Sequence, residues 1–169
     1  MKKIVVFVED NYEDLELWYP KIRLEEAGFN VVVAGPVAGQ IYKAKHGYPC
    51  KADLSFKEAV GKKFDAAVIP GGFAPDRLRR SPEVLQIVKE LYNAQKTVAF
   101  ICHGGWVPIS AKIVKGRRVT GTVAIKDDLE NAGGMWEDQA VVIDGPLISS
   151  RTPADLHLFA KAIVDKLLE

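Results

Sequence analysis

The sequence has few of the residues that form disulfide frameworks or zinc sites. It contains two cysteines, Cys50 and Cys102, and three histidines scattered along 169 residues. Two cysteines are too few for a disulfide framework, and widely spaced histidines argue against a zinc site, so we expect no metal and no cofactor. No G-x-G-x-x-G or P-loop pattern is present, which argues against nucleotide binding.

An excess of one charge and long apolar runs are also missing. The 23 Lys and Arg residues balance 22 Asp and Glu residues, so no overall field attracts nucleic acid or an anionic membrane. No apolar run approaches the roughly 20 residues that span a bilayer. The first run, residues 4–8, is also too short for a signal peptide. We therefore expect a cytoplasmic protein with neither nucleic acid nor membrane as a partner.

Short β-prone runs alternate with stretches of helical periodicity along the chain. This alternation predicts an α/β fold, a mostly parallel sheet with helices on both faces. No repeat or linker interrupts it, so residues 1–169 are expected to form a single domain. The predicted strands are residues 4–8, 30–34, 66–69, 97–101, 140–143 and 147–149, with a hairpin within residues 39–53.

Helix signals fall between the strands. Asn11 is the predicted N-cap of a first helix, which Pro20 is expected to kink or divide. Ser81-Pro82 and Thr152-Pro153 should begin two more helices. Apolar residues recur at helical spacing in all three: Leu15, Trp18 and Ile22; Val84, Ile87, Val88 and Leu91; and Leu156, Phe159, Ala160, Ile163, Val164 and Leu167.

The segment 97–105 carries the strongest chemical signal. Its β-prone run ends on Cys102, followed by His103 and two glycines, which is the form of a nucleophile elbow. A helix of about ten residues starting behind the sulfur predicts a lowered thiol pKa. A lone cysteine is more often a packed apolar residue, and we interpret Cys50 that way.

Ligands of open α/β sheets bind beyond the carboxyl ends of the parallel strands. Three segments should meet there: residues 9–13, the turn Pro70-Gly71-Gly72, and Cys102-His103. Cys102 is the candidate nucleophile, and the backbone N–H groups of Gly72 and His103 can hold a developing oxyanion. His103 can also move a proton if another group orients its ring.

Seven short motifs stand in a fixed order along almost the whole chain. They are Glu13-Asp14-Leu15-Glu16 with Tyr19-Pro20, Lys45-His46-Gly47, Pro70-Gly71-Gly72, Cys102-His103-Gly104, Ile125-Lys126-Asp127-Asp128, Asn131-Ala132-Gly133, and Ser149-Ser150-Arg151 with Pro153. In this order they resemble the ThiJ/PfpI superfamily, most closely its PfpI-type intracellular proteases. The resemblance implies a three-layer, flavodoxin-like sandwich of the class I glutamine amidotransferase type, with the cysteine on a strained elbow.

The resemblance also implies roles for individual residues. Glu13 matches the family's acidic residue near the cysteine sulfur, where a protonated carboxyl would need a raised pKa. Asp76 occupies the place of an acid that pairs with the histidine of a neighbouring subunit, here His103. The implied assembly is a homo-oligomer, a dimer or a hexamer, with the active site near the subunit interface.

Three departures from the family pattern affect the pocket. Asp76 stands where the family usually has glutamate, Gly105 where it usually has proline, and Thr122-Val123 where Tyr-Pro is common. The pocket candidates are Trp106, Thr122 and His46, although His46 beside a glycine is also typical of a turn. Asp127-Asp128 is most typical of an exposed helix start.

Three functions remain open from the sequence. The first is a cysteine-nucleophile hydrolase, a peptidase or amidase, which the resemblance places first. The second is a cofactor-free glyoxalase or protein deglycase, acting on methylglyoxal or its adducts through a hemithioacetal. The third is a non-enzymatic stress protein that senses peroxide through Cys102 or acts as a chaperone. Proton transfer dominated by Glu13 would favour the second, and a histidine that needs Asp76 would favour the first.

Overall fold

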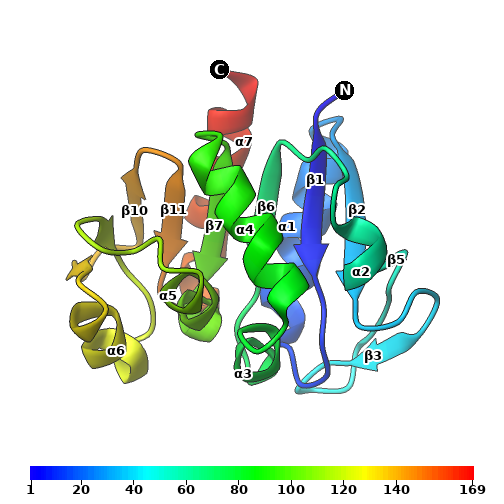
Figure 1. Ribbon diagram of the computed structural model, residues 1–169, viewed down its shortest axis with the longest axis horizontal. Helices are drawn as coiled ribbons and strands as arrows, with labels where there is room; N and C mark the ends of the chain where they lie inside the picture. Colours follow the sequence, from blue (N-terminus) through cyan, green and yellow to red (C-terminus); the bar gives the residue numbers. More distant parts are fainter.

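A seven-stranded sheet forms the centre of the computed structural model, which describes residues 1–169 (Figure 1). Its strands are β1 (Lys3–Phe7), β2 (Asn30–Gly35), β5 (Leu54–Ser55), β6 (Ala66–Ile69), β7 (Thr97–Ile101), β10 (Val141–Asp144) and β11 (Leu147–Ser150). They lie in the order β10-β11-β7-β6-β1-β2-β5. All neighbours are parallel except β10 and β11, so the predicted mostly parallel sheet is confirmed.

Two small strand pairs lie outside this sheet. The predicted hairpin is present as antiparallel β3 (Ile41–Lys43) and β4 (Pro49–Lys51). Strands β8 (Arg118–Val119) and β9 (Met135–Trp136) form a second, parallel pair. Cys50 in β4 is 2% exposed, and burial raises the pKa of its thiol to about 11, consistent with a packed residue.

Helices cover both faces of the sheet. They are α1 (Asp14–Glu26), α2 (Phe56–Ala59), α3 (Ala74–Leu78), α4 (Pro82–Asn93), α5 (Trp106–Ser110), α6 (Lys126–Asn131) and α7 (Leu156–Leu168). Helices α1 and α7 pack together on one face, and α4 lies on the other with α2 and α5 beside it (Figure 1). None of these helices combines the length and apolarity that crossing a bilayer requires.

Helices α4 and α7 follow the sequence prediction closely. Ser81 is the N-cap of α4, and its hydroxyl accepts the N–H of Val84. Every apolar residue predicted at helical spacing in these two helices is buried. Only the start of α7 differs, because a 3₁₀ turn at Pro153–Asp155 precedes it and Thr152 makes no capping bond.

Helix α1 differs from the prediction in its start and continuity. Asn11 has a φ of 63° and lies outside the helix. Glu13 is the N-cap instead, and its carboxylate accepts the N–H groups of Leu15 and Glu16. The helix runs through Pro20 without dividing. Proline has no N–H and cannot donate the hydrogen bond to the carbonyl four residues earlier. Burial of this face of the helix offsets the missing bond.

The apolar stripe predicted for α1 faces outward. Leu15 is 56% and Ile22 57% exposed, and Trp18 is half-buried. The face packed against the sheet instead contains Glu16, Leu17, Pro20 and Leu24. A charged residue therefore belongs to the buried side, while an apolar patch remains on the surface.

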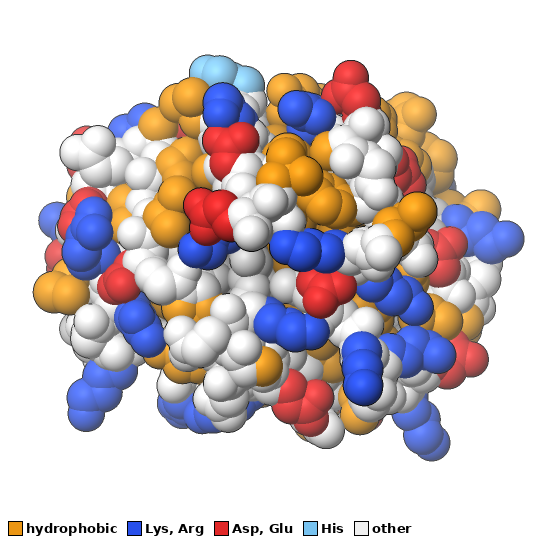
Figure 2. All heavy atoms as spheres, turned by 90° about the horizontal axis from the view of Figure 1, so that it is seen from above, with side chains coloured by type: hydrophobic (Ala, Val, Ile, Leu, Met, Phe, Trp, Pro, Cys, Tyr) orange, Lys and Arg blue, Asp and Glu red, His pale blue; other side chains and the backbone are white.

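Acidic and basic side chains are interspersed over the end of the molecule that carries the two termini (Figure 2). This end lies beyond the amino ends of the parallel strands. The intermixing agrees with the near balance of charges in the sequence.

Candidate active site

Cys102 lies directly after β7, between β6 and β11, at the carboxyl end of the sheet. Its φ is 59°, in the left-handed region that strains a non-glycine residue. A 3₁₀ turn, Cys102–Gly105, leads into five-residue α5 instead of the longer helix predicted. The strand-to-helix elbow is therefore present, but the helix behind it is short.

Backbone hydrogen bonds tie the loop after β1 to the turn after β6. The N–H of Glu13 donates to the Gly71 carbonyl at 3.1 Å, and the N–H of Phe73 donates to the Asn11 carbonyl at 2.8 Å. Gly72 has a φ of 75°, and a Cβ there would lie 2.5 Å from both the Asn11 oxygen and the Glu13 nitrogen. Only glycine lets the two segments approach this closely.

Glu16 is the acid that lies beside the nucleophile. It is fully buried, and neither carboxyl oxygen has a hydrogen-bond partner of normal geometry. A Cβ on Gly71 would lie 2.5 Å from its Oε1 and 2.8 Å from the Cβ of Cys102. The carboxyl of Glu16 and the side chain of Cys102 thus both lie against Gly71, with little more than its backbone between them.

The environment of Glu16 favours its protonated form. Burial, followed by the charge of Glu13, raises the pKa of Glu16 to about 8. The Gly71 N–H, the Lys45 ammonium and the Cys102 side chain lower this pKa, but by less. The carboxyl is therefore mostly protonated at neutral pH and can both give and accept a proton.

Glu13 does not hold the position beside the sulfur that the resemblance implied. Its Oε2 accepts the N–H groups of Leu15 at 2.8 Å and Glu16 at 3.1 Å, and its Oε1 lies 3.9 Å from Nε2 of His46. The carboxylate is thus directed to the start of α1. The motif Glu13-Asp14-Leu15-Glu16 contained the acid that lies beside Cys102, but no local pattern in the sequence distinguished Glu16 from Glu13.

The lowered pKa predicted for Cys102 is also wrong for this site. Burial and then the charge of Glu16 raise the pKa of the Cys102 thiol to about 12. The backbone N–H groups of His103 and Gly72, predicted to hold an oxyanion, hydrogen-bond to the sulfur and lower this pKa. They do not outweigh burial and the charge of Glu16. The resting nucleophile is a thiol.

His103 lies beside the sulfur and has one ring nitrogen free. Its Nδ1 lies 3.4 Å from Sγ of Cys102, and its Nε2 makes no hydrogen bond within the chain. Burial, followed by the charge of Lys45, lowers the pKa of His103, while Asp128 raises it. The imidazole is therefore neutral at neutral pH and can act as a base.

Asp76 lies on α3 and points away from this centre within the single chain. Its carboxylate pairs with the Arg80 guanidinium at 2.8 Å and does not contact His103. Within one chain, Nε2 of His103 therefore has no carboxylate partner.

A cavity of about 620 Å³ opens over Cys102. It contains one predicted pocket residue, His46, and a cation that the sequence analysis did not single out, Lys45. Trp106 instead contacts the His103 ring, and Thr122 lines a separate cavity. The lining residues are Asn11, Glu13, Lys45, His46, Gly72, Phe73, Cys102, His103 and Pro153.

Thr122 supports the elbow from behind. Its N–H donates to the carbonyl of Cys102 at 3.4 Å. Because this donor is a backbone group, every residue except proline would keep the bond at this position.

One group of side chains at the cavity mouth has metal-ligating atoms close together. Those of Glu13, Asp14 and His46 lie within 4.8 Å of one another. The two Asp14 oxygens accept the N–H groups of His46 and Tyr48, and Glu13 caps α1. These contacts explain the cluster as a support for the loop between β3 and β4.

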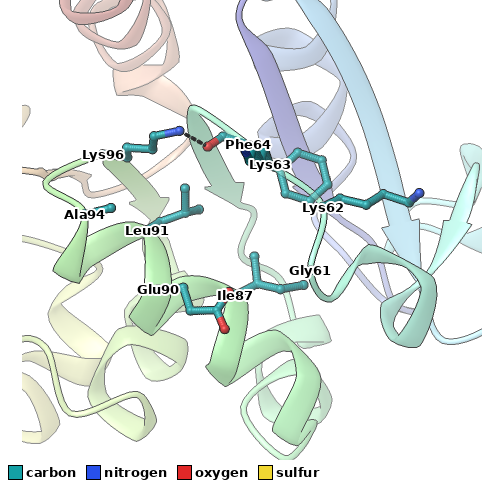
Figure 3. A pocket seen from close by; sticks show the side chains of 9 residues that line it. All are labelled: Gly61, Lys62, Lys63, Phe64, Ile87, Glu90, Leu91, Ala94 and Lys96. Atoms are coloured by element: carbon teal, nitrogen blue, oxygen red, sulfur yellow. Dashed lines mark hydrogen bonds between the residues drawn. The ribbon is translucent and has the colours of Figure 1, made fainter.

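A second cavity, of about 210 Å³, lies at the opposite end of the sheet (Figure 3). It lies between α4 and the segment before β6, far from the elbow. Its Lys96 ammonium donates to the Phe64 carbonyl at 2.7 Å and to Asp65 at 3.2 Å. The lysine therefore serves to join two backbone segments.

The close approach at Gly71 gives a first testable prediction. Gly71→Ala should lower the free energy of unfolding by about 1–3 kcal/mol and abolish activity, because the new methyl group would displace Glu16 or Cys102. Gly105→Ala is the matched control, since its methyl group would meet the mobile end of Ile125 at 3.0 Å. Urea unfolding and turnover assays measure both effects, and equal losses in the two variants would contradict the prediction.

Comparison with known proteins agrees with this geometry. The DJ-1/PfpI family matches residues 2–166. The chain is 44% identical to Deglycase PfpI of Pyrococcus furiosus over 167 residues, 99% of each chain. It is 40% identical over 158 residues, 94% of each chain, to YraA of Bacillus subtilis, whose name assigns it provisionally to the cysteine proteases.

A solved structure is similar over the whole chain. The two-domain protein from Anabaena variabilis contains DJ-1/ThiJ/PfpI-like and ferritin-like domains. It matches with a TM-score of 0.96 and 43% identity, covering 99% of this chain and 48% of that chain. By these matches in sequence and structure, the chain belongs to the DJ-1/PfpI family.

Proposed function

We propose that this chain is a cofactor-free deglycase or glyoxalase that acts on reactive dicarbonyls such as methylglyoxal, or on their adducts with amines. The observation that carries the proposal is the position of the buried carboxyl of Glu16 beside Cys102, with only Gly71 between them. The name of the PfpI relative, a deglycase, supports the same chemistry. The peptidase reading, placed first from the sequence, has only the provisional name of YraA in its favour.

The reaction begins at the sulfur. Cys102 adds to the aldehyde carbon of a 2-oxoaldehyde, a C–S bond forms, and the thiol proton passes to the aldehyde oxygen to give a hemithioacetal. With an amine adduct, the sulfur displaces the amine instead, so the C–N bond breaks and the thiol proton leaves with the amine. Both routes give the same hemithioacetal.

An internal transfer then completes the reaction without an external oxidant. A proton leaves the former aldehyde carbon and another is added to the neighbouring carbonyl carbon. The hydroxyl proton on the first carbon passes to the oxygen of the second, so the first carbon is oxidised and the second is reduced. The resulting thioester is hydrolysed by water to a 2-hydroxy acid and free Cys102. Glu16, with a pKa near 8, and neutral His103 are suited to move these protons near neutral pH.

Peptide hydrolysis makes a different demand on the site. A histidine must protonate the leaving amine, and it is normally oriented by a carboxylate. Within this chain Nε2 of His103 has no such partner, whereas the sulfur already has Glu16. The protonated Glu16 beside the sulfur is a proton donor that a Cys-His peptidase does not need, and it favours carbonyl chemistry even where a second protomer supplies a carboxylate to Nε2.

We further propose that the chain forms a homo-oligomer in which Asp76 of one protomer faces His103 of another. The free Nε2 and the exposed position of Asp76 support this arrangement. The apolar patch on α1, with Leu15 and Ile22 more than half exposed, is a surface that a second copy can cover. Tyr48, 59% exposed, extends the patch to the loop that carries His46.

Parallel assays test the proposed function. Purified protein should convert methylglyoxal to lactate and release amine from a methylglyoxal–lysine adduct, with little turnover of a peptide amide. Cys102→Ala should lose all activity, while Cys50→Ala, the matched control, should retain it. Turnover of the peptide amide alone, dependent on Cys102, would support the peptidase instead. Loss of activity in both cysteine variants would remove the evidence for Cys102 as the nucleophile.

A further inference from the structure

Trp106 is held by two side chains in this structure. Its indole N–H donates to Oδ2 of Asp128 at 2.9 Å. The Arg79 guanidinium lies 5.5 Å from its ring centroid, and Nε of Arg79 donates to the Ser110 hydroxyl at 2.9 Å. The indole is therefore fixed by segments that are remote in sequence, α6 and the end of α3.

The held indole in turn contacts the catalytic histidine. The rings of His103 and Trp106 meet edge to face, with centroids 5.1 Å apart and planes at 66°. On its other side, Nδ1 of His103 lies 3.4 Å from Sγ of Cys102. The imidazole thus lies between the nucleophile and an indole whose own orientation depends on Asp128.

We propose that Trp106 and Asp128 form a brace that positions the His103 ring against Cys102, with Asp128 acting through the indole. The inference rests on the proposed function for its effect on turnover, since His103 must carry protons in that reaction. It assigns to Asp128 a role as a positioning residue, distinct from any contact with substrate.

The charges around His103 fit this role. The side chains facing the ring are Cys102, Lys45 and, beyond the indole, Asp128. The ammonium of Lys45 lowers the pKa of His103 after burial does, and the carboxylate of Asp128 raises it. Glu13 and His46 line the same cavity, and the Arg79 guanidinium lies over the indole ring.

A favourable interaction with the N-terminus of α6 does not by itself explain the hydrogen bond that Asp128 accepts from Trp106. Asp127 stands beside it in the first turn of α6 and meets the same helix N-terminus, yet it makes no side-chain hydrogen bond or ion pair. The two neighbours have the same charge, both are exposed, and only Asp128 contacts Trp106. Asp127→Asn is therefore a matched control.

The experiment compares three variants by proton NMR titration of His103 and by turnover of methylglyoxal. Asp128→Asn keeps an acceptor for the indole but removes the charge, so the pKa of His103 should fall. Trp106→Phe removes the N–H donor, and both the pKa and the chemical shifts of His103 should change. Trp106→Phe breaks the hydrogen bond and should lower kcat about tenfold with KM within about twofold. Asp128→Asn keeps the bond and should lower kcat by less, while Asp127→Asn should match the wild type. The signals of His46 and His157 provide internal references.

The readouts separate this inference from the proposed function. If the wild type lacks dicarbonyl activity, the proposed function fails, but the titration still tests the brace. An unchanged His103 titration in folded Asp128→Asn and Trp106→Phe would overturn the brace. Equal shifts in Asp127→Asn and Asp128→Asn would also overturn it, by showing a general effect of charge at the helix start. Urea unfolding establishes that each variant is folded, and either of the two brace variants suffices for the test.

Discussion

Glu16→Gln should remove most of the activity while making the protein more stable at neutral and alkaline pH. Glutamine occupies nearly the same volume but cannot exchange a proton with the hemithioacetal or with Cys102. Loss of one proton-transfer group commonly costs on the order of a hundredfold in turnover. The same substitution removes an ionisable group from a fully buried position.

The stability effect has a definite pH dependence. The pKa of Glu16 rises from an ordinary 4.5 to about 8 in the folded chain, so the folded state keeps a proton that the unfolded chain releases. The stabilising effect of this difference is complete below pH 4.5 and is lost as pH rises towards 8. At pH 7 the raised pKa lowers the free energy of unfolding of the wild type by about 3 kcal/mol relative to low pH. The glutamine variant does not show this loss.

Urea unfolding at pH 4.5 and pH 8 measures this difference. The two proteins should have similar free energies of unfolding at the lower pH and diverge at the higher one. Curves that stay parallel across this range would show that Glu16 titrates normally, and the assigned proton-transfer role would lose its basis.

Glu13→Gln distinguishes the two acids of the motif. It should destabilise the protein by about 1 kcal/mol, because the N-cap of α1 is weakened, and reduce turnover much less than Glu16→Gln does. A larger loss of turnover from Glu13→Gln than from Glu16→Gln would restore Glu13 to the catalytic position.

Mixed oligomers of two inactive variants should recover activity. If Asp76 serves His103 of a neighbour, Asp76→Ala and Cys102→Ala should each be inactive alone. After subunit exchange, some sites would combine an intact Asp76 from one protomer with an intact Cys102 from the other. Turnover should then approach about a quarter of the wild-type value for random dimer mixing, because half of the dimers are mixed and each has one complete site.

Arg80→Ala is the matched control for this experiment. In the single chain Asp76 pairs with Arg80 at 2.8 Å, and this pair could be its whole role. Equal losses in Asp76→Ala and Arg80→Ala would indicate such a structural role. Demonstrated exchange of labelled subunits without recovery of activity would contradict the shared site.

The strands and two long helices were predictable because their signals are local. Residues 66–69 and 97–101 are continuous apolar runs, and both strands have those bounds in the structure. Ser81 supplies a cap that needs only residues three positions away. The stripes of α4 and α7 follow from helical periodicity, since each helix has one strongly apolar face.

The buried face of helix α1 was harder to predict because the residues on its two faces give contradictory signals. Leu15 and Ile22 are apolar yet exposed, whereas Glu16 is acidic and fully buried. Hydrophobic periodicity therefore assigned the wrong face to the core, and the placement of Glu13 near the sulfur came from the family resemblance alone. The position of Glu16 depends on its approach to Gly71 across the sheet, which no local pattern encodes.

The elbow itself was predictable, but its electrostatics were not. A strand ending in Cys-His-Gly-Gly indicates the turn, and the convergence of three loops follows from parallel strands. The pKa of Cys102 depends instead on how deeply the fold buries the sulfur and on the charge of Glu16. The contact between Trp106 and Asp128 joins residues 22 positions apart and likewise requires the folded chain.

The capping of α1 by Glu13 means that the mouth of the cavity and the catalytic acid belong to one cooperative unit of unfolding. The N–H of Glu13 is bonded to the Gly71 carbonyl, and its carboxylate holds the first amides of the helix that carries Glu16. Opening this loop breaks all three bonds together. Hydrogen exchange at the amides of Leu15 and Glu16 should therefore give one common free energy of opening, and that value measures how often the chain displaces the proton donor proposed here.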